Sequence, residues 1–192
     1  MNLPNKLSLL RIILIPFMLF FYLATFVPYG KIIAIAIFII AALTDMLDGK
    51  IARKYNLVTN LGKLLDPIAD KLLVMSALLL VVVDYTIPHP YGVIIAIIII
   101  GRELLISAFR QVAASKNIVM AADMFGKIKT CTQDAALPLL FLVSFLTYDV
   151  TINATALQII KIVGYCLIGL ATLFTILSGA NYMIKNKEVL KD

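Results

Sequence analysis

The stretch that decides the fold is residues 32–53, IIAIAIFIIAALTDMLDGKIAR. Its first twelve residues are all apolar, and the charged residues follow only near its end. A helix needs about 20 predominantly apolar residues to cross a bilayer, so this stretch is typical of a membrane span. The whole chain agrees, because 62% of its 192 residues are hydrophobic, 15% are charged and the mean hydropathy is +1.01. Such a composition is too apolar for a soluble domain, and we predict an integral membrane protein.

Six apolar stretches of this kind occupy almost the whole chain. The predicted spans are residues 12–29, 32–53, 64–84, 91–113, 131–148 and 155–183. They leave no room for a separate soluble domain, so residues 1–192 are expected to form one membrane domain. Polar and apolar residues alternate over residues 2–11, which predicts a short amphipathic helix on the membrane surface. The expected fold is therefore all-α, with six transmembrane helices preceded by this interfacial helix.

The basic residues indicate how the chain crosses the membrane. Most of the 17 Lys and Arg residues lie at the two termini and in the second and fourth loops, whereas the opposite loops hold only Lys31 and, slightly inside a span, Lys161. Cytoplasmic segments of membrane proteins retain Lys and Arg. We therefore predict a multi-pass membrane protein, with both termini and the functional site on the cytoplasmic side. The net charge of +6 needs no nucleic acid, because basic residues beside a membrane attract anionic lipid headgroups.

Four of the eleven acidic residues fall within 26 residues, at Asp45, Asp48, Asp66 and Asp70. A charge at the centre of a span costs about 2.5 to 3.5 kcal/mol, so four of them need compensation. Residues three and four apart share a helix face, and a rise of about 1.5 Å per residue brings both pairs to one depth. Four carboxylates neutralise two divalent cations, and oxygen ligands favour Mg²⁺ or Mn²⁺. The alternative is four structural carboxylates paired with Lys50, Lys54, Lys63 and Lys71.

Small residues and one arginine accompany the four aspartates at helical spacing. Gly49, Ala52 and Gly62 leave room for a bulky group against the backbone, and the Arg53 guanidinium can bind a phosphate through two hydrogen bonds. The pattern reads Asp45, two residues, Asp48-Gly49, two residues, Ala52-Arg53, eight residues, Gly62, three residues, Asp66, three residues, Asp70. Every position fits the signature of the CDP-alcohol phosphotransferase family, which this chain closely resembles.

The resemblance implies a six-helix membrane enzyme, usually a homodimer, whose site opens to the cytoplasm. It implies that two divalent cations are bound by Asp45, Asp48, Asp66 and Asp70. It also implies that Asp70 is the general base, which takes the proton of an acceptor alcohol as CMP leaves a CDP-activated lipid. The CDP-lipid pocket would be lined by Gly49, Ala52, Arg53 and Gly62. Whether the transfer takes one step or two is left open.

The identity of the acceptor alcohol has to be predicted from other residues, because the signature concerns the binding of the CDP-activated donor. Residues 2–11, which include Asn5, and residues 101–103, with Arg102 and Glu103, resemble the bacterial branch of the family that makes phosphatidylglycerophosphate. This resemblance implies CDP-diacylglycerol and sn-glycerol 3-phosphate as substrates. An acceptor that carries a phosphate also needs cations near the four carboxylates. The candidates are Lys63, Arg110, Lys116, Lys127 and Lys129.

Several alternatives remain open at this stage. Arg102 and Glu103 are equally consistent with a structural ion pair inside the bundle. Another acceptor, such as inositol phosphate, serine or a second phosphatidylglycerol, would use the same chemistry. A divalent-cation transporter would also bury carboxylates, but near the midplane and between broken helices. A purely structural membrane protein has no use for four costly aspartates.

Overall fold

The computed structural model describes residues 3–54, 60–116, 124–150 and 152–186. Within these ranges only the backbone is described at residues 3, 4, 45–54, 60, 61, 63, 64 and 115. The described part of the chain is helical and contains no strand. Its helices are α1 (Leu3–Leu23), α2 (Gly30–Lys54), α3 (Asn60–Val83), α4 (Tyr91–Ser115), α5 (Met124–Tyr148) and α6 (Ala154–Lys185).

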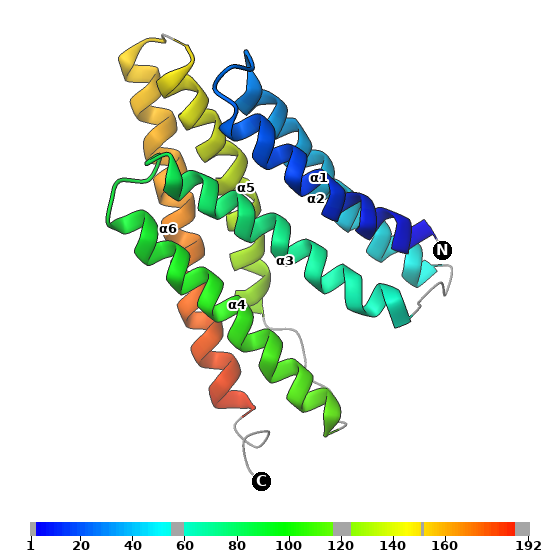
Figure 1. Ribbon diagram of the computed structural model, residues 1–192. Coiled ribbons are helices and arrows are strands. Elements are labelled where there is room, and N and C mark those ends of the chain that lie inside the picture. Colours follow the sequence, from blue (N-terminus) through cyan, green and yellow to red (C-terminus); the bar gives the residue numbers. More distant parts are fainter. Residues whose placement is uncertain (1–2, 55–59, 117–123, 151, 187–192) are drawn as a thin grey trace.

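The six helices form one bundle, in which neighbours along the chain run in opposite directions (Figure 1). Helix α1 packs against α2 and α3, α5 packs against α6 and α2, and α4 packs against α6 and α3. The main core joins all six helices through large buried side chains, among them Met18, Phe38, Leu78, Ile99, Phe141 and Ile168. Burial of such side chains contributes about 1.5 to 3 kcal/mol each in a soluble protein; in lipid their close packing contributes instead.

Each of the six predicted spans corresponds to one helix. Four helices, α1, α4, α5 and α6, are long and apolar enough to cross a membrane, and α2 contains the shorter apolar segment Gly30–Thr44. The chain is therefore an all-helical membrane protein. The predicted start of the fifth span was wrong, because α5 begins at Met124 and not at residue 131. The charges of Lys127 and Lys129 had suggested a loop there, but Lys129 is buried between helices.

The beginning of the chain also differs from the prediction. Instead of a short surface helix followed by a separate span, Leu3–Leu23 form one helix that continues through Pro16. The reason is a buried stripe of residues three or four apart that runs along one face of α1, with the spacing of a single helix. It consists of Asn5, Ser8, Arg11, Ile15, Met18 and Tyr22. Asn5, Ser8 and Arg11 of the opening segment thus face neighbouring helices, whereas Lys6 is exposed.

The two ends of the bundle differ in character. Helix α2 ends and α3 begins at the end where the chain starts (Figure 1), and we call this the signature end because it carries the four aspartates. At the opposite end, the Asp84 carboxylate accepts hydrogen bonds from Tyr22 Oη at 2.5 Å, Thr86 Oγ1 at 2.5 Å and Ser144 Oγ. Asp84 therefore ties the ends of α1, α3 and α5 together.

Candidate functional site

The signature residues lie on α2 and α3, which pack against each other. The backbone of Asp45 and Asp48 belongs to the last third of α2, and Asp66 and Asp70 lie one helical turn apart on α3. The side chains of Asp45, Asp48, Gly49, Ala52 and Arg53 fall outside the described part of the structure. No group of three or more His, Cys, Asp or Glu residues among the described side chains could hold a metal ion. The convergence of the four carboxylates therefore remains a prediction.

Helix α1 contacts the signature segments of α2 and α3 through buried polar side chains. Ser8 donates a hydrogen bond to Asp66 Oδ1, so α1 orients one of the predicted metal ligands. Arg11 is completely buried, and its Nε donates to the carbonyl of Ala41 at 3.3 Å. Because Ala41 lies one turn before Asp45 on the same face of α2, Arg11 brings a buried positive charge to the level of the signature. Asn5 is buried on the same face of α1.

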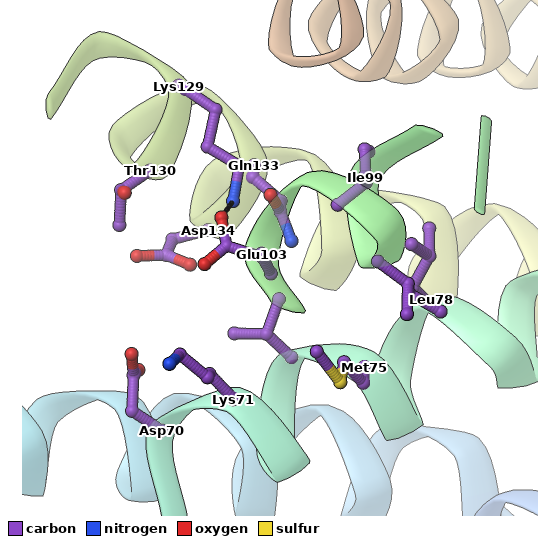
Figure 2. Close-up of a pocket in the computed structure, with 12 residues that line it drawn as sticks. Asp70, Lys71, Met75, Leu78, Ile99, Glu103, Lys129, Thr130, Gln133 and Asp134 are labelled. Carbon is purple, nitrogen blue, oxygen red and sulfur yellow. Dashed lines mark hydrogen bonds and ion pairs between the residues drawn. The ribbon is translucent and has the colours of Figure 1, made fainter. Parts of the chain in front are cut away.

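The exposed carboxylate of Asp70 stands where three concave surfaces meet. The first, here the inner cavity, is lined by Asp70, Lys71, Val74, Met75, Leu78, Ile99, Ile100, Glu103, Lys129, Thr130, Gln133 and Asp134. Figure 2 shows Asp70 and Lys71 of α3 facing Thr130 and Asp134 of α5 and Glu103 of α4 across this cavity. Asp70 of α3 thus lies opposite residues of both α4 and α5.

The second surface is a basic groove on the other side of Asp70. Its lining comprises Pro67, Asp70, Lys71, Arg102, Glu103, Arg110, Gly126, Lys127, Thr130, Cys131 and Tyr182. Arg110 is fixed in it, because its Nε donates to Tyr182 Oη at 3.1 Å and its guanidinium lies 5.5 Å from the centre of that ring. Two of the predicted acceptor-binding cations, Arg110 and Lys127, therefore share one groove with Asp70. Lys116 is exposed at the end of α4 and does not line this groove, and the side chain of Lys63 lies outside the described residues.

A network of polar side chains separates the groove from the core. Glu103 Oε1 accepts from Arg102 Nη1 at 3.0 Å and from Lys129 Nζ at 2.5 Å, and Arg102 Nη2 donates to Ser178 Oγ at 3.0 Å. The pairing of Arg102 with Glu103 is the structural alternative considered above. Lys129, only 4% exposed, also binds Glu103 and lines no part of the basic groove. Its predicted contact with the acceptor phosphate is therefore less well supported than that of Arg110.

Two glycines make room for the Arg102 side chain between α5 and α6. A Cβ atom at Gly126 would lie 3.5 Å from Nη2 of Arg102, and one at Gly179 would lie 3.3 Å from its Cγ. The second distance is tighter than most such contacts, so a larger residue at 179 would push the arginine aside. The sequence prediction had not connected either glycine with Arg102.

The third surface is an apolar groove between α2, α3 and α5. Its lining residues are Phe38, Ile39, Ala42, Leu43, Asp70, Leu73, Val74, Asp134, Ala135 and Pro138. Ile39 and Leu43 are exposed, so this groove reaches the apolar outer face of the bundle. Asp70 therefore has a cationic surface on one side and an apolar surface on the other.

Comparison with known proteins shows the family of the chain. Residues 1–177 match the sequence model of the family described as CDP-alcohol phosphatidyltransferase. The chain belongs to this family. It is 39% identical to the CDP-diacylglycerol--glycerol-3-phosphate 3-phosphatidyltransferase of Bacillus subtilis (strain 168), over 99% of this chain and 97% of the relative. Proteins of the same name in Rickettsia bellii (35% identity; 94% and 93% covered) and Escherichia coli K12 (44%; 71% and 74%) are also similar.

Several residues around Asp70 of this CDP-alcohol phosphatidyltransferase were not expected to belong to the site. They are Lys71, which donates to Ser107 of α4, together with Thr130, Gln133 and Asp134 of α5. Gln133 and Asp134 did leave a signal, because polar side chains inside a span are costly and usually functional. Lys71, a charge inside the predicted third span, was considered only as a structural partner of the aspartates. Thr130 left no signal, since only the packing of the helices brings it to the cavity.

Proposed function

We propose that this chain transfers the phosphatidyl group of CDP-diacylglycerol to sn-glycerol 3-phosphate and releases phosphatidylglycerophosphate and CMP. The observation that carries the proposal is the basic groove, in which Arg102, Arg110 and Lys127 stand beside Asp70. A hydroxyl that approaches Asp70 and carries a phosphate a few bonds away would place that phosphate among these cations. The signature and the names of the three relatives point to the same reaction.

The predicted site fits two divalent cations by the chemistry of its donors. Asp66 and Asp70 offer carboxylate oxygens one turn apart on α3, and Asp66 is oriented by Ser8. Such hard oxygen donors suit Mg²⁺ or Mn²⁺. We assign these cations to Asp45, Asp48, Asp66 and Asp70. When bound, they would neutralise the pyrophosphate of the donor and stabilise the charge on departing CMP.

The side chains of the protein then have separable tasks in the transfer. Asp70 accepts the proton of the C1 hydroxyl of glycerol 3-phosphate, and the oxygen attacks the phosphorus that carries the diacylglycerol. A new phosphorus–oxygen bond forms as the bond to CMP breaks, and CMP leaves with the electron pair. Arg110, held by Tyr182, and Lys127 bind the acceptor phosphate. A single displacement is the simplest course, with no covalent bond to the enzyme.

The donor lipid is accommodated on the other side of Asp70. The apolar groove between α2, α3 and α5 offers a surface for an acyl chain that leads from the membrane to the carboxylate. Gly49, Ala52, Arg53 and Gly62 would receive the CDP group, and Gly62 is buried in agreement with a close approach of backbone segments. A lipid donor explains why an apolar surface ends at the carboxylate of the proposed general base; a soluble CDP-alcohol would not need this surface.

We further propose six membrane crossings, a cytoplasmic site and a homodimer in a bacterial plasma membrane. The basic residues Arg110, Lys116 and Lys127 lie towards the signature end, which supports a cytoplasmic position for that end. At the opposite end, the cation Lys31 pairs with Asp149 at 3.2 Å. Helices α2 and α3 are unbroken over Gly30–Lys54 and Asn60–Val83, which argues against the broken helices of an ion transporter.

The direct test is turnover by the purified protein in mixed micelles with CDP-diacylglycerol and Mg²⁺ or Mn²⁺. Release of CMP is measured with glycerol 3-phosphate, inositol phosphate, serine and phosphatidylglycerol as separate acceptors, and the lipid product is identified by mass spectrometry. We expect CMP and phosphatidylglycerophosphate from glycerol 3-phosphate alone. A faster reaction with an acceptor that lacks phosphate would disprove the assignment of glycerol 3-phosphate while leaving the CDP-lipid chemistry intact.

A further inference from the structure

The side chain of Gln133 is buried without a hydrogen-bond partner. It is 0% exposed, and neither Oε1 nor Nε2 makes a hydrogen bond within the described part of the chain. A buried amide that makes none of its hydrogen bonds is costly and rare in folded proteins, so it needs an explanation. The other buried polar side chains of α5 do not share this property, because Lys129 binds Glu103 and Ser144 binds Asp84.

The position of Gln133 suggests what completes its hydrogen bonds. The residue lines the inner cavity that opens at Asp70, and in Figure 2 it projects from α5 beside Glu103. One part of the cavity wall is apolar, with Met75, Leu78 and Ile99 among its residues, and the other part carries Asp70, Lys71, Glu103, Lys129, Thr130 and Asp134. The orphaned amide therefore faces a space next to the predicted general base.

The size and lining of the inner cavity restrict its occupant. The cavity volume is about 40 Å³, whereas one water needs roughly 10 to 15 Å³ on the same scale. A hydroxyl or hydroxymethyl group fits, but a nucleotide base or a second lipid does not. A hydroxyl can accept from Nε2 and donate to Oε1 of the same amide. The cationic side chains of the wall are already engaged, because Lys129 binds Glu103 and Lys71 donates to Ser107. An uncharged hydroxyl therefore satisfies the Gln133 amide at the lowest desolvation cost.

The inner cavity and the basic groove share Asp70, Lys71, Glu103 and Thr130. One small acceptor bound at Asp70 therefore reaches both. If its C1 hydroxyl meets Asp70 and its phosphate lies among Arg110 and Lys127, the C2 hydroxyl is the group left to enter the inner cavity. From this we infer that Gln133 is a specificity-determining residue, which binds the non-reacting C2 hydroxyl of the acceptor. The inference rests on glycerol 3-phosphate being the acceptor.

The inference makes a quantitative statement about substrate choice. Sites built to bind a hydroxyl reject analogues that lack it, because their polar groups are then left unpaired. The matching analogue is 3-hydroxypropyl phosphate, which retains the reacting hydroxyl and the phosphate but lacks the C2 hydroxyl. We expect kcat/KM for glycerol 3-phosphate to exceed that for the analogue by roughly 10- to 150-fold.

The test compares these two acceptors in wild-type protein and in Gln133→Met, with CDP-diacylglycerol saturating. Methionine keeps the length of the side chain but has no amide. The ratio of kcat/KM for glycerol 3-phosphate to that for the analogue should therefore fall to within about threefold of one. The KM for CDP-diacylglycerol should stay unchanged. Thr132→Val is the matched control, since Thr132 is the neighbouring residue on α5, bonds only to backbone carbonyls of its own helix and lines none of the three surfaces. It should keep the wild-type preference.

Three results would overturn the role of Gln133. The first is a wild-type ratio of the two kcat/KM values near one. The second is an equal loss of kcat/KM with both acceptors in Gln133→Met, and the third is an unchanged ratio in that variant; these two would assign Gln133 to packing or to a bound water. If Gln133→Met does not elute as a folded protein, Gln133→Leu, which also lacks the amide and adds no charge, decides by the same ratio. Failure of wild-type protein to use glycerol 3-phosphate at all would overturn the proposed function and this inference together, and is thereby distinguished from failure of the inference alone.

Discussion

Lys129 and Glu103 form an ion pair between α5 and α4, with Nζ of the lysine 2.5 Å from Oε1 of the glutamate. The same oxygen accepts from Nη1 of Arg102 at 3.0 Å. Lys129 is almost fully buried, so its charge depends on this carboxylate. The pair gives Lys129 a structural task that Arg110 and Lys127, which line the open groove, do not have.

Breaking this pair should lower stability more than it changes acceptor binding. Lys129→Ala leaves Glu103 with Arg102 alone and should reduce stability by about 3 kcal/mol, measured as a lower thermal unfolding temperature in detergent. The double variant Lys129→Met with Glu103→Gln removes both charges of the pair and should recover part of the loss, because the amide oxygen of Gln can still accept from Arg102. A Lys129→Ala protein that is as stable as wild type but has a raised KM for glycerol 3-phosphate would return Lys129 to the acceptor site.

Arg110 and Lys127 should act on the acceptor alone. Changing either to Ala removes one charge-assisted contact to phosphate, which is worth roughly 1.5 to 3 kcal/mol, a factor of about 10 to 150. The KM for glycerol 3-phosphate should rise by that factor, while the KM for CDP-diacylglycerol changes little. Steady-state kinetics with each substrate varied in turn measures both. Lys185→Ala, an exposed cation in the last turn of α6 that lines none of the three surfaces, is the control.

The sequence predicted the helices well because long apolar runs report the membrane directly. The prediction failed where the hydrogen-bond partner of a polar residue lies on a different helix. Asn5, Ser8 and Arg11 resemble the polar face of a surface helix, but in the bundle Ser8 binds Asp66 and Arg11 binds the carbonyl of Ala41. Such partners are 30 or more residues away in the sequence, so the pattern of α1 alone cannot distinguish a buried polar face from an exposed one.

In the site, too, local patterns were predicted from the sequence and contacts between helices were not. The spacing of Asp45, Asp48, Asp66 and Asp70 was sufficient to recognise the family, because a signature is a local pattern. The surroundings of Asp70 depend on how α3, α4 and α5 pack. Gln133 is therefore the residue that the sequence left without a role and that the structure brings to the cavity of Asp70.

Asp84 should matter for stability and not for turnover. Its carboxylate accepts from Tyr22 and Ser144, which belong to two other helices, at the end of the bundle opposite to Asp70. Asp84→Ala leaves both hydroxyls without this partner and should cost about 3 kcal/mol, seen as a lower unfolding temperature. Below that temperature kcat per folded molecule should equal the wild-type value. Asp149→Ala is the control, because the side chain of Asp149 is 38% exposed and its pair with Lys31 is worth less. A large loss of kcat in Asp84→Ala would contradict the assignment.

Replacing Asp70 should affect turnover much more than binding of CDP-diacylglycerol. In Asp70→Asn three of the four predicted carboxylate ligands remain, so the variant should still bind CDP-diacylglycerol in the presence of Mg²⁺ or Mn²⁺, measured by equilibrium binding of the labelled lipid. Its turnover should fall by at least about 10²- to 10⁴-fold, because the amide accepts no proton from the attacking hydroxyl. Asp66→Asn is the informative comparison. Asp66 is held by Ser8 and is assigned only as a ligand, so its replacement should raise the metal concentration needed for half-maximal activity, and excess metal should restore part of kcat. Rescue of Asp70→Asn by excess metal to the same extent as Asp66→Asn would show that Asp70 is a ligand without a separate role as base.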